Sequence, residues 1–210
     1  MKKDIASILR KLHQMHGEPR VELSYTNALE LVIATVLSAQ CTDERVNAVT
    51  KGLFKKYRTA EDYVKAPGAE LEEDIRPTGF YRNKAKAIKS IAAELLQKFD
   101  GAVPDDIDTF ATVKGIGRKS ANMIVGLAYK KPGIIVDTHV ARVSGRIGLT
   151  ANRGPEKIET DLRSAVPMES WMPFSLLMIL HGRYICTAKK PDCPRCLLRE
   201  GCDYYSMGGT

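Results

Sequence analysis

The sequence has no long run of apolar residues. Its longest stretches, such as LVIATVL at 31–37 and LLMIL at 176–180, are far shorter than the roughly 20 residues that a membrane-spanning helix needs. The N-terminal stretch MKKDIASILRKLHQ also lacks the apolar centre of a signal peptide, and its spacing is typical of an amphipathic helix. These absences lead us to expect a cytoplasmic protein with no membrane partner.

Clean strand patterns are scarce as well. The stretch VDTHVARV at 136–143 contains β-branched residues but no regular alternation, and Asp137 has the character of a helix N-cap. Elsewhere apolar residues recur at helical spacing, which predicts an all-α fold of about ten short helices. The clearest segments are 5–15, 27–40, 43–57, 84–99, 118–129, 156–166 and 174–184, with Thr42, Gly101 and Gly154-Pro155 as boundary signals.

Cysteine is nearly absent before residue 186, where Cys41 is the single example and is predicted to be a buried structural thiol. The other four, Cys186, Cys193, Cys196 and Cys202, are spaced C-x6-C-x2-C-x5-C. Disulfides rarely persist in the cytoplasm, so this crowding indicates a metal site. Zinc sites usually contain two close cysteine pairs and this segment has one, whereas an iron–sulfur cluster suits four thiolates along one wrapping loop. The spacing favours the cluster over zinc.

Four thiolates around such a cluster leave a net negative charge that requires nearby cations. The candidates in sequence are Arg183, Lys189, Lys190 and Arg195. Lys189 and Lys190 lie at the tip of the loop between the first two cysteines. They could contact a phosphate or only solvate the loop, and the sequence favours neither.

Acidic residues are outnumbered by basic ones. The chain has 25 Asp and Glu against 32 Lys and Arg, which gives a net charge of +7 and a pI near 9.1. This balance suits a polyanionic partner such as nucleic acid, although many housekeeping proteins are equally basic without one.

The stretch KGIGRKSAN at 114–122 joins two glycines to the start of a helix. Gly115 and Gly117 allow a positive φ and a close approach of the backbone to a ligand, and the helix start presents free N–H groups that suit a phosphate. The stretch is not a dinucleotide-binding fingerprint, because Ser120 replaces the third glycine and no strand precedes it.

Lys119 is the cation of this stretch best placed for chemistry. It falls opposite the apolar face of the helix and beside residues that are not a solvated surface either, so we expect it to face a cleft between two lobes and to be partly buried there. A lysine must be neutral to act as a nucleophile, and burial together with a helix N-terminus favours the neutral form. The apolar face comprises Ala121, Ile124, Val125 and Ala128.

Five segments together resemble the endonuclease III family of helix-hairpin-helix DNA glycosylases and abasic-site lyases. They are LSAQCTDERVN at 37–47, TGFYRNKAKAI at 78–88, VKGIGRKSAN at 113–122, VDTHVARV at 136–143 and LHGRYICTAKKPDCPRC at 180–196. The resemblance covers nearly the whole chain and keeps the order of the segments.

The resemblance implies a two-lobed fold. A helical domain at 22–130 would end in the helix-hairpin-helix, residues 1–21 with 131–210 would form an iron–sulfur cluster domain, and DNA would bind in a cleft between them. It further implies a monomer associated with the nucleoid of a bacterium or an archaeon.

The resemblance also implies the reaction and its residues. Lys119 would attack C1′ of an oxidised pyrimidine nucleotide in double-stranded DNA, form a Schiff base and cleave the abasic site by β-elimination. Asp137 would stabilise the developing positive charge and assist proton transfer. The four cysteines, Cys186, Cys193, Cys196 and Cys202, would ligate a 4Fe–4S cluster.

Several residues are implied as DNA contacts. Gly115 and Gly117 would grip a phosphate through their amides, with Lys114, which stands where the family usually has proline, adding a contact. Gln40 would fill the gap left by the flipped nucleotide, and Phe80 would insert as a wedge, although core packing is the alternative for Phe80. The remaining implied contacts are His139, Arg142, Lys189 and Lys190.

Two other functions remain open from the sequence. A monofunctional mismatch glycosylase of the same fold would carry another residue, such as Tyr or Ser, in place of Lys119. A non-catalytic iron–sulfur DNA-binding or redox-sensing protein would not need Lys119 and Asp137 together.

Overall fold

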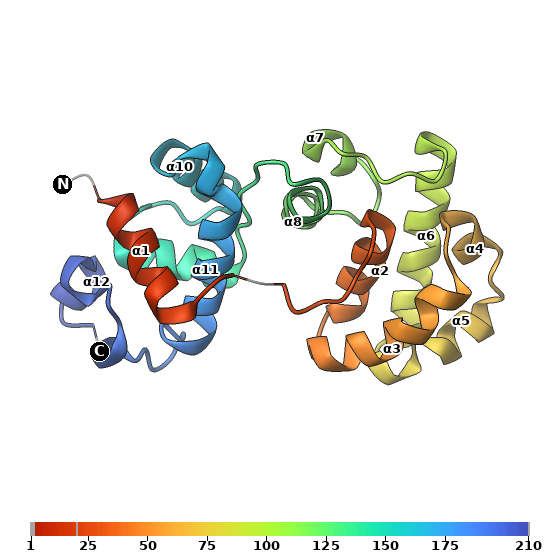
Figure 1. Ribbon diagram of the computed structural model, residues 1–210, viewed down its shortest axis with the longest axis horizontal. Helices are drawn as coiled ribbons and strands as arrows, with labels where there is room; N and C mark the ends of the chain where they lie inside the picture. Colours follow the sequence, from red (N-terminus) through yellow and green to blue (C-terminus); the bar gives the residue numbers. More distant parts are fainter. Residues whose placement is uncertain (1–2, 20, 210) are drawn as a thin grey trace. The chain divides into compact units, whose positions relative to one another are not determined.

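The computed structural model describes residues 3–19 and 21–209 and is helical throughout that part of the chain (Figure 1). Twelve α-helices and four short 3-10 helices occur among these residues, without a β-strand. This confirms the predicted all-α class. None of the described helices is long and apolar enough to cross a membrane.

The described residues divide into two compact units. One unit is formed by Val21–Lys131, and the other combines Met1–Arg20 with Pro132–Thr210. We refer to them as the hairpin unit and the cysteine unit.

The hairpin unit is built on a continuous apolar core. α2 has apolar residues on nearly every side and therefore packs against three helices, α3, α6 and α8. Its residues Leu31 and Leu37 are fully buried. α6 contributes Ile88, Ile91 and Leu95 to the same core at helical spacing. Its elements are α2 (Ala28–Ser38), α3 (Asp43–Lys56), α4 (Ala60–Lys65), α5 (Gly68–Asp74), η1 (Arg76–Thr78), α6 (Tyr81–Phe99), α7 (Ile107–Phe110) and α8 (Arg118–Tyr129).

The cysteine unit has a second core centred on α11, against which both α1 and α9 pack. Leu12, Val140 and Phe174 are fully buried there, so the first helix of the chain is held by one of the last (Figure 1). Its elements are α1 (Ile5–His16), α9 (Thr138–Ile147), α10 (Pro155–Ala165), η2 (Met168–Ser170), α11 (Trp171–Tyr184), η3 (Cys193–Arg195), η4 (Arg199–Gly201) and α12 (Asp203–Ser206).

Helix boundaries that have a capping residue were predicted well. Thr42 caps α3 by accepting a hydrogen bond from the Arg45 amide, and Gly154 directly precedes Pro155 at the start of α10. α8 spans the predicted residues 118–129. The estimate of ten helices was too low, because α4, α5, α7 and α12 have seven residues or fewer and are too short to show a period.

Candidate functional site

The helix-hairpin-helix is formed by α7, the turn that holds Gly115, and α8. Gly115 has φ +97°, a conformation that an L-residue adopts only with strain. Gly117 is different: as the N-cap of α8 it has φ −83° and ψ 161°, so the positive φ expected there is wrong. A Cβ at Gly117 would meet nothing within 4 Å. The turn geometry therefore requires glycine at position 115 but not at position 117.

A glycine N-cap leaves the start of α8 open. A common N-cap is a side-chain oxygen that accepts from one of the first amides of the helix, and Gly117 has no side chain to do so. The first N–H groups of α8 and the positive end of its dipole are then available to an anion from outside the helix. Lys114, on the other arm of the turn, is exposed, as a residue in contact with a polyanion would be.

Lys119 is the second residue of α8, and its side chain is exposed. The expectation that it is partly buried is therefore wrong. Its neighbours on that face behave as predicted, since Asn122 and Gly126 are both buried. Arg118 forms an ion pair with Asp108, 2.7 Å between Nη1 and Oδ1. Lys119 thus presents its amine outward at a helix N-terminus.

Asp137 caps α9, in the cysteine unit. Its Oδ1 accepts a hydrogen bond from the Val140 amide at 2.8 Å, which confirms the predicted N-cap. The carboxylate is half-buried, and among the residues that the structure describes its Oδ2 receives no hydrogen bond. One oxygen therefore fixes the orientation of the carboxylate, while the other is left for a substrate or a proton.

Arg142 holds the backbone near the cysteines. Its Nε donates to the Cys186 carbonyl at 3.1 Å, and its Nη2 donates to the Gly182 carbonyl at 2.8 Å and approaches His139 Nδ1 at 3.2 Å. These contacts give Arg142 a structural role that the sequence did not indicate. Lys189 and Lys190 are exposed at the tip of their loop.

Gln40 and Phe80 are exposed residues in the hairpin unit with left-handed backbone conformations, φ +53° and +48°. The Phe80 side chain is 64% exposed, which argues against the core-packing alternative. Such conformations are uncommon for residues other than glycine, and outside helix caps they are often found at functional sites.

The four cysteines of the C-terminal segment line one cavity. Within residues 3–19 and 21–209, however, no three Cys, His, Asp or Glu side chains lie close enough to hold a single metal ion. Tetrahedral zinc bound at about 2.3 Å would bring its sulfur ligands within about 3.8 Å of one another. The four cysteines lie around one shared cavity in this structure.

Two polar residues beside the cysteines were missed by sequence reasoning. Arg146 Nη1 lies 3.3 Å from Cys186 Sγ, and its guanidinium also donates to the carbonyls of Thr187 and Ala188. His181 is 1% exposed, with Nε2 3.5 Å from Cys196 Sγ. The sequence did not indicate either residue, because both precede Cys186 in the chain. The helices α9 and α11 bring them beside the cysteines only in the folded protein.

Burial controls protonation around these thiols. It lowers the pKa of His181 to about 4, with a smaller contribution from His16, so the imidazole is neutral. Burial likewise raises the pKa of the Cys196 thiol to about 11 and raises that of Cys193. Because thiolates are the form of cysteine that binds metals, any metal bound by these cysteines would displace protons from them.

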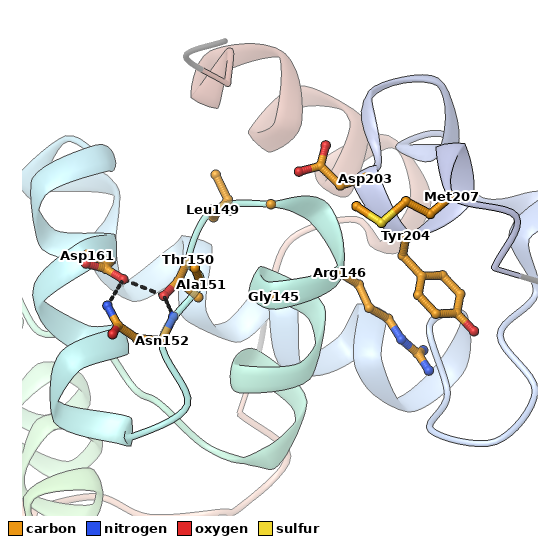
Figure 2. Close-up of a pocket in the computed structure, with 11 residues that line it drawn as sticks. Gly145, Arg146, Leu149, Thr150, Ala151, Asn152, Asp161, Asp203, Tyr204 and Met207 are labelled. Atoms are coloured by element: carbon orange, nitrogen blue, oxygen red, sulfur yellow. Dashed lines mark hydrogen bonds between the residues drawn. The ribbon is translucent and has the colours of Figure 1, made fainter.

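A hollow of about 760 Å³ in the cysteine unit contains none of the predicted catalytic residues. Figure 2 shows that polar groups of this hollow form hydrogen bonds with one another. Asp161 accepts hydrogen bonds from Thr150 and from Asn152, the latter at 2.8 Å. Arg146 stacks on Tyr204 with 4.4 Å between the guanidinium carbon and the ring centroid. We assign no chemistry to this hollow.

The all-helical fold and the glycine hairpin at the start of α8 agree with what the family comparison shows. The chain belongs to the HhH-GPD superfamily of base excision DNA repair proteins, whose family model matches residues 33–168.

Within this superfamily the chain is similar to endonuclease III. It is 43% identical to endonuclease III of Bacillus subtilis (strain 168) over 204 residues, which cover 95% of this chain and 93% of that protein. It is 42% identical to the Synechocystis sp. protein of that name over 202 residues, covering 96% and 92%. A solved structure of a trapped endonuclease III–DNA covalent intermediate matches with a TM-score of 0.90 and 44% identity, covering 100% of this chain and 99% of the other.

Proposed function

We propose that the chain is a bifunctional DNA glycosylase and abasic-site lyase of base excision repair that excises oxidised pyrimidines from double-stranded DNA. The observation that carries this proposal is the exposed amine of Lys119 at the start of α8, directly after the glycine hairpin. A hairpin that grips a phosphate would bring the sugar of a nearby nucleotide within reach of this amine. The similarity to an endonuclease III that forms a covalent intermediate with DNA supports the assignment.

The proposed reaction proceeds through Lys119. The neutral amine attacks C1′, the N-glycosidic bond breaks, and the base departs with the electron pair and a proton. Opening of the sugar ring gives a Schiff base between Nζ and C1′. Loss of a C2′ proton then expels the 3′ phosphate by β-elimination, and water releases the lysine. Because Lys119 is exposed in the free protein, the bound DNA must supply the desolvation that favours the neutral amine.

Asp137 is proposed to stabilise positive charge on the sugar and to move protons. The hydrogen bond from the Val140 amide holds the carboxylate in one orientation, so the group is ordered before substrate arrives. An ordered carboxylate stabilises a developing cation without reorganisation during the reaction.

The proposed DNA contacts divide into two kinds. Gly115, Gly117 and Lys114 hold phosphate, which fixes the position of the duplex without reading its sequence. Gln40 and Phe80 enter the base stack, where the exposed ring of Phe80 acts as an apolar wedge. Further phosphate contacts are proposed for His139, Arg142, Lys189 and Lys190, with the protein acting as a monomer at the nucleoid.

We also propose a 4Fe–4S cluster held by Cys186, Cys193, Cys196 and Cys202, and the cavity that these four cysteines share supports this proposal. Arg146 would compensate the negative charge of the cluster, because its guanidinium already contacts Cys186 Sγ. When bound, the cluster would tie together the turns η3 and η4, and the proposed reaction needs no redox step from it.

Borohydride trapping tests the catalytic proposal. The protein is incubated with duplex DNA containing thymine glycol or an abasic site, together with the reductant, and covalent complex is measured. We expect a stable adduct with the native chain, none with Lys119→Gln, and a native yield with Lys86→Gln, which removes an exposed lysine from α6. An adduct that persists in Lys119→Gln would show that another amine is the nucleophile.

The same assay with a mismatched duplex added separates the alternative functions. A monofunctional mismatch glycosylase would release the base from the mismatched duplex without forming an adduct, and a non-catalytic binding protein would do neither. Metal and sulfide analysis tests the cluster: we expect iron with acid-labile sulfide and a brown protein. A colourless protein that contains zinc would refute the cluster.

A further inference from the structure

Lys84 is a buried lysine with no role in the proposed reaction. It lies on α6 and is 5% exposed, and no other lysine or arginine in the described residues is buried to this degree. Its Nζ donates to the carbonyl of Leu37 at 2.8 Å and to the carbonyl of Thr78 at 2.7 Å. A lysine is rarely buried unless its polar end is satisfied, and here two backbone oxygens satisfy it.

Both carbonyls belong to residues at the C-terminal ends of helices. Leu37 lies in the last turn of α2, and Thr78 is the last residue of η1. The final carbonyls of a helix have no partner within it, and a cation at that end also interacts favourably with the helix dipole. Lys84 therefore connects two helix ends that are separated by 41 positions in the sequence.

Each of these helix ends leads directly to a strained, exposed residue. Gln40 follows Leu37 by three positions, and Phe80 follows Thr78 by two. Both have a left-handed backbone and expose their side chains. The other non-glycine residues with positive φ in the described chain, Asp100 and Lys130, are ordinary C-caps of α6 and α8.

Lys84 is also bonded to the Phe80 segment through its own backbone, since its amide donates to the Phe80 carbonyl at 3.1 Å. The side chain and the main chain of one residue thus hold the α2 end, the η1 end and the start of α6 together. Lys84 thus adds hydrogen bonds between the segments that lead to Gln40 and to Phe80, beyond the direct packing of α2 on α6.

We propose that Lys84 is a positioning residue, which sets the spacing of Gln40 and Phe80 so that both can enter the same gap in the base stack. This inference rests on the proposed function. Lys84 itself would touch no DNA, and its effect would appear in the recognition of a lesion rather than in the affinity for undamaged duplex, which the hairpin phosphate contacts provide.

Lys89 offers a matched control on the same helix. Its Nζ also donates to two backbone carbonyls, those of Val64 at 2.8 Å and of Ala66, at the end of α4. This link joins α6 to a helix end that leads to neither Gln40 nor Phe80. Replacing Lys89 removes the same type of interaction without disturbing the two exposed loops.

The test compares Lys84→Met with Lys89→Met after circular dichroism has established that both fold. Affinity is measured for duplex with a tetrahydrofuran abasic analogue and for undamaged duplex. We expect the ratio of the two affinities to fall by about tenfold in Lys84→Met and to stay native in Lys89→Met. An equal fall in both variants would overturn the proposal, because it would indicate a general loss of stability.

A double-mutant cycle separates positioning from other roles. If Lys84 acts through the two loops, Lys84→Met should add no further loss when Gln40 and Phe80 are already alanine. A full additional loss in that background would contradict the proposal. If Lys84→Met does not fold, Lys84→Gln, which keeps two N–H donors on a shorter side chain, takes its place, and a native affinity ratio in a folded Lys84→Gln protein would refute the inference. Failure of the lysine adduct assay would leave these binding results unaffected, so the two proposals can fail separately.

Discussion

The helices α8 and α9 follow one another in the chain and begin in opposite ways. α8 begins with Gly117, which has no side chain to cap it, whereas α9 begins with Asp137, whose carboxylate accepts from the Val140 amide. A glycine cap leaves amide donors for an external anion, and an aspartate cap uses a donor of its own helix to orient a carboxylate. One helix start is thus suited to bind negative charge and the other to present it.

In the proposed reaction this difference would give the two units complementary roles. The hairpin unit would supply positive groups, which are the open amides of α8 and the amine of Lys119. The cysteine unit would supply the ordered carboxylate of Asp137. A reaction that passes through a positively charged sugar attached to a polyanion requires both kinds of group.

The largest effect is expected from Asp137→Asn. Asparagine accepts the same capping hydrogen bond, so α9 should begin unchanged while the charge is lost. General acid–base groups contribute about 10²- to 10⁴-fold, and we expect single-turnover β-elimination on an abasic duplex to slow by that range. Thermal melting checks that the fold is retained. Native turnover in Asp137→Asn would show that Asp137 is only a cap.

The caps also show which parts of the site the sequence could predict. Asp137 was correctly predicted as an N-cap and α8 was placed at its observed residues, because both depend on residues within one turn. The exposure of Lys119 was wrongly predicted, because helical periodicity identifies the faces of a helix but not what packs against them. The α8 face that bears Asn122 is buried, yet Lys119 extends from its end into solvent.

Contacts between residues that are far apart in the sequence could not be predicted either, because they leave no local pattern. Nothing near Lys84 in sequence indicates that it bonds to Leu37, 47 positions away, and the motif around Gln40 contains no lysine. Arg146 reaches Cys186 across 40 positions in the same way. Cysteine spacing predicted that the four thiols lie together because all four come from one short segment, and they do line one cavity, whereas Arg146 beside them comes from α9.

A smaller effect is expected from Gly117→Asp, which gives α8 the kind of cap that α9 has. The backbone at Gly117 accepts an L-residue, and a Cβ there meets nothing within 4 Å, so the fold should be retained. The new carboxylate would occupy the amides proposed for phosphate and repel it. We expect affinity for undamaged duplex to fall about 10- to 100-fold. The slope of log affinity against log salt concentration should decrease by the amount that corresponds to about one phosphate contact.

Gly117→Ala is the control for that substitution, because it adds a Cβ without an acceptor or a charge. Binding titrations of the two variants across a range of salt concentrations provide the comparison. Equal affinities for Gly117→Asp and Gly117→Ala would mean that the start of α8 does not contact phosphate.

The smallest expected effect is a difference in thermal stability between two substitutions of Asp137. It separates the role of Asp137 as a helix cap from its proposed role as a charged group in the reaction. Asp137→Ala removes both the capping acceptor and the charge, whereas Asp137→Asn removes the charge only. Loss of an N-cap costs about 1 kcal/mol, and for a chain of this size that lowers the melting temperature by about 2–4 °C. We therefore expect Asp137→Ala to melt a few degrees below Asp137→Asn, while both lose β-elimination activity to a similar extent. Calorimetry of the two variants checks this, and identical melting temperatures would show that the Val140 hydrogen bond contributes little to the start of α9.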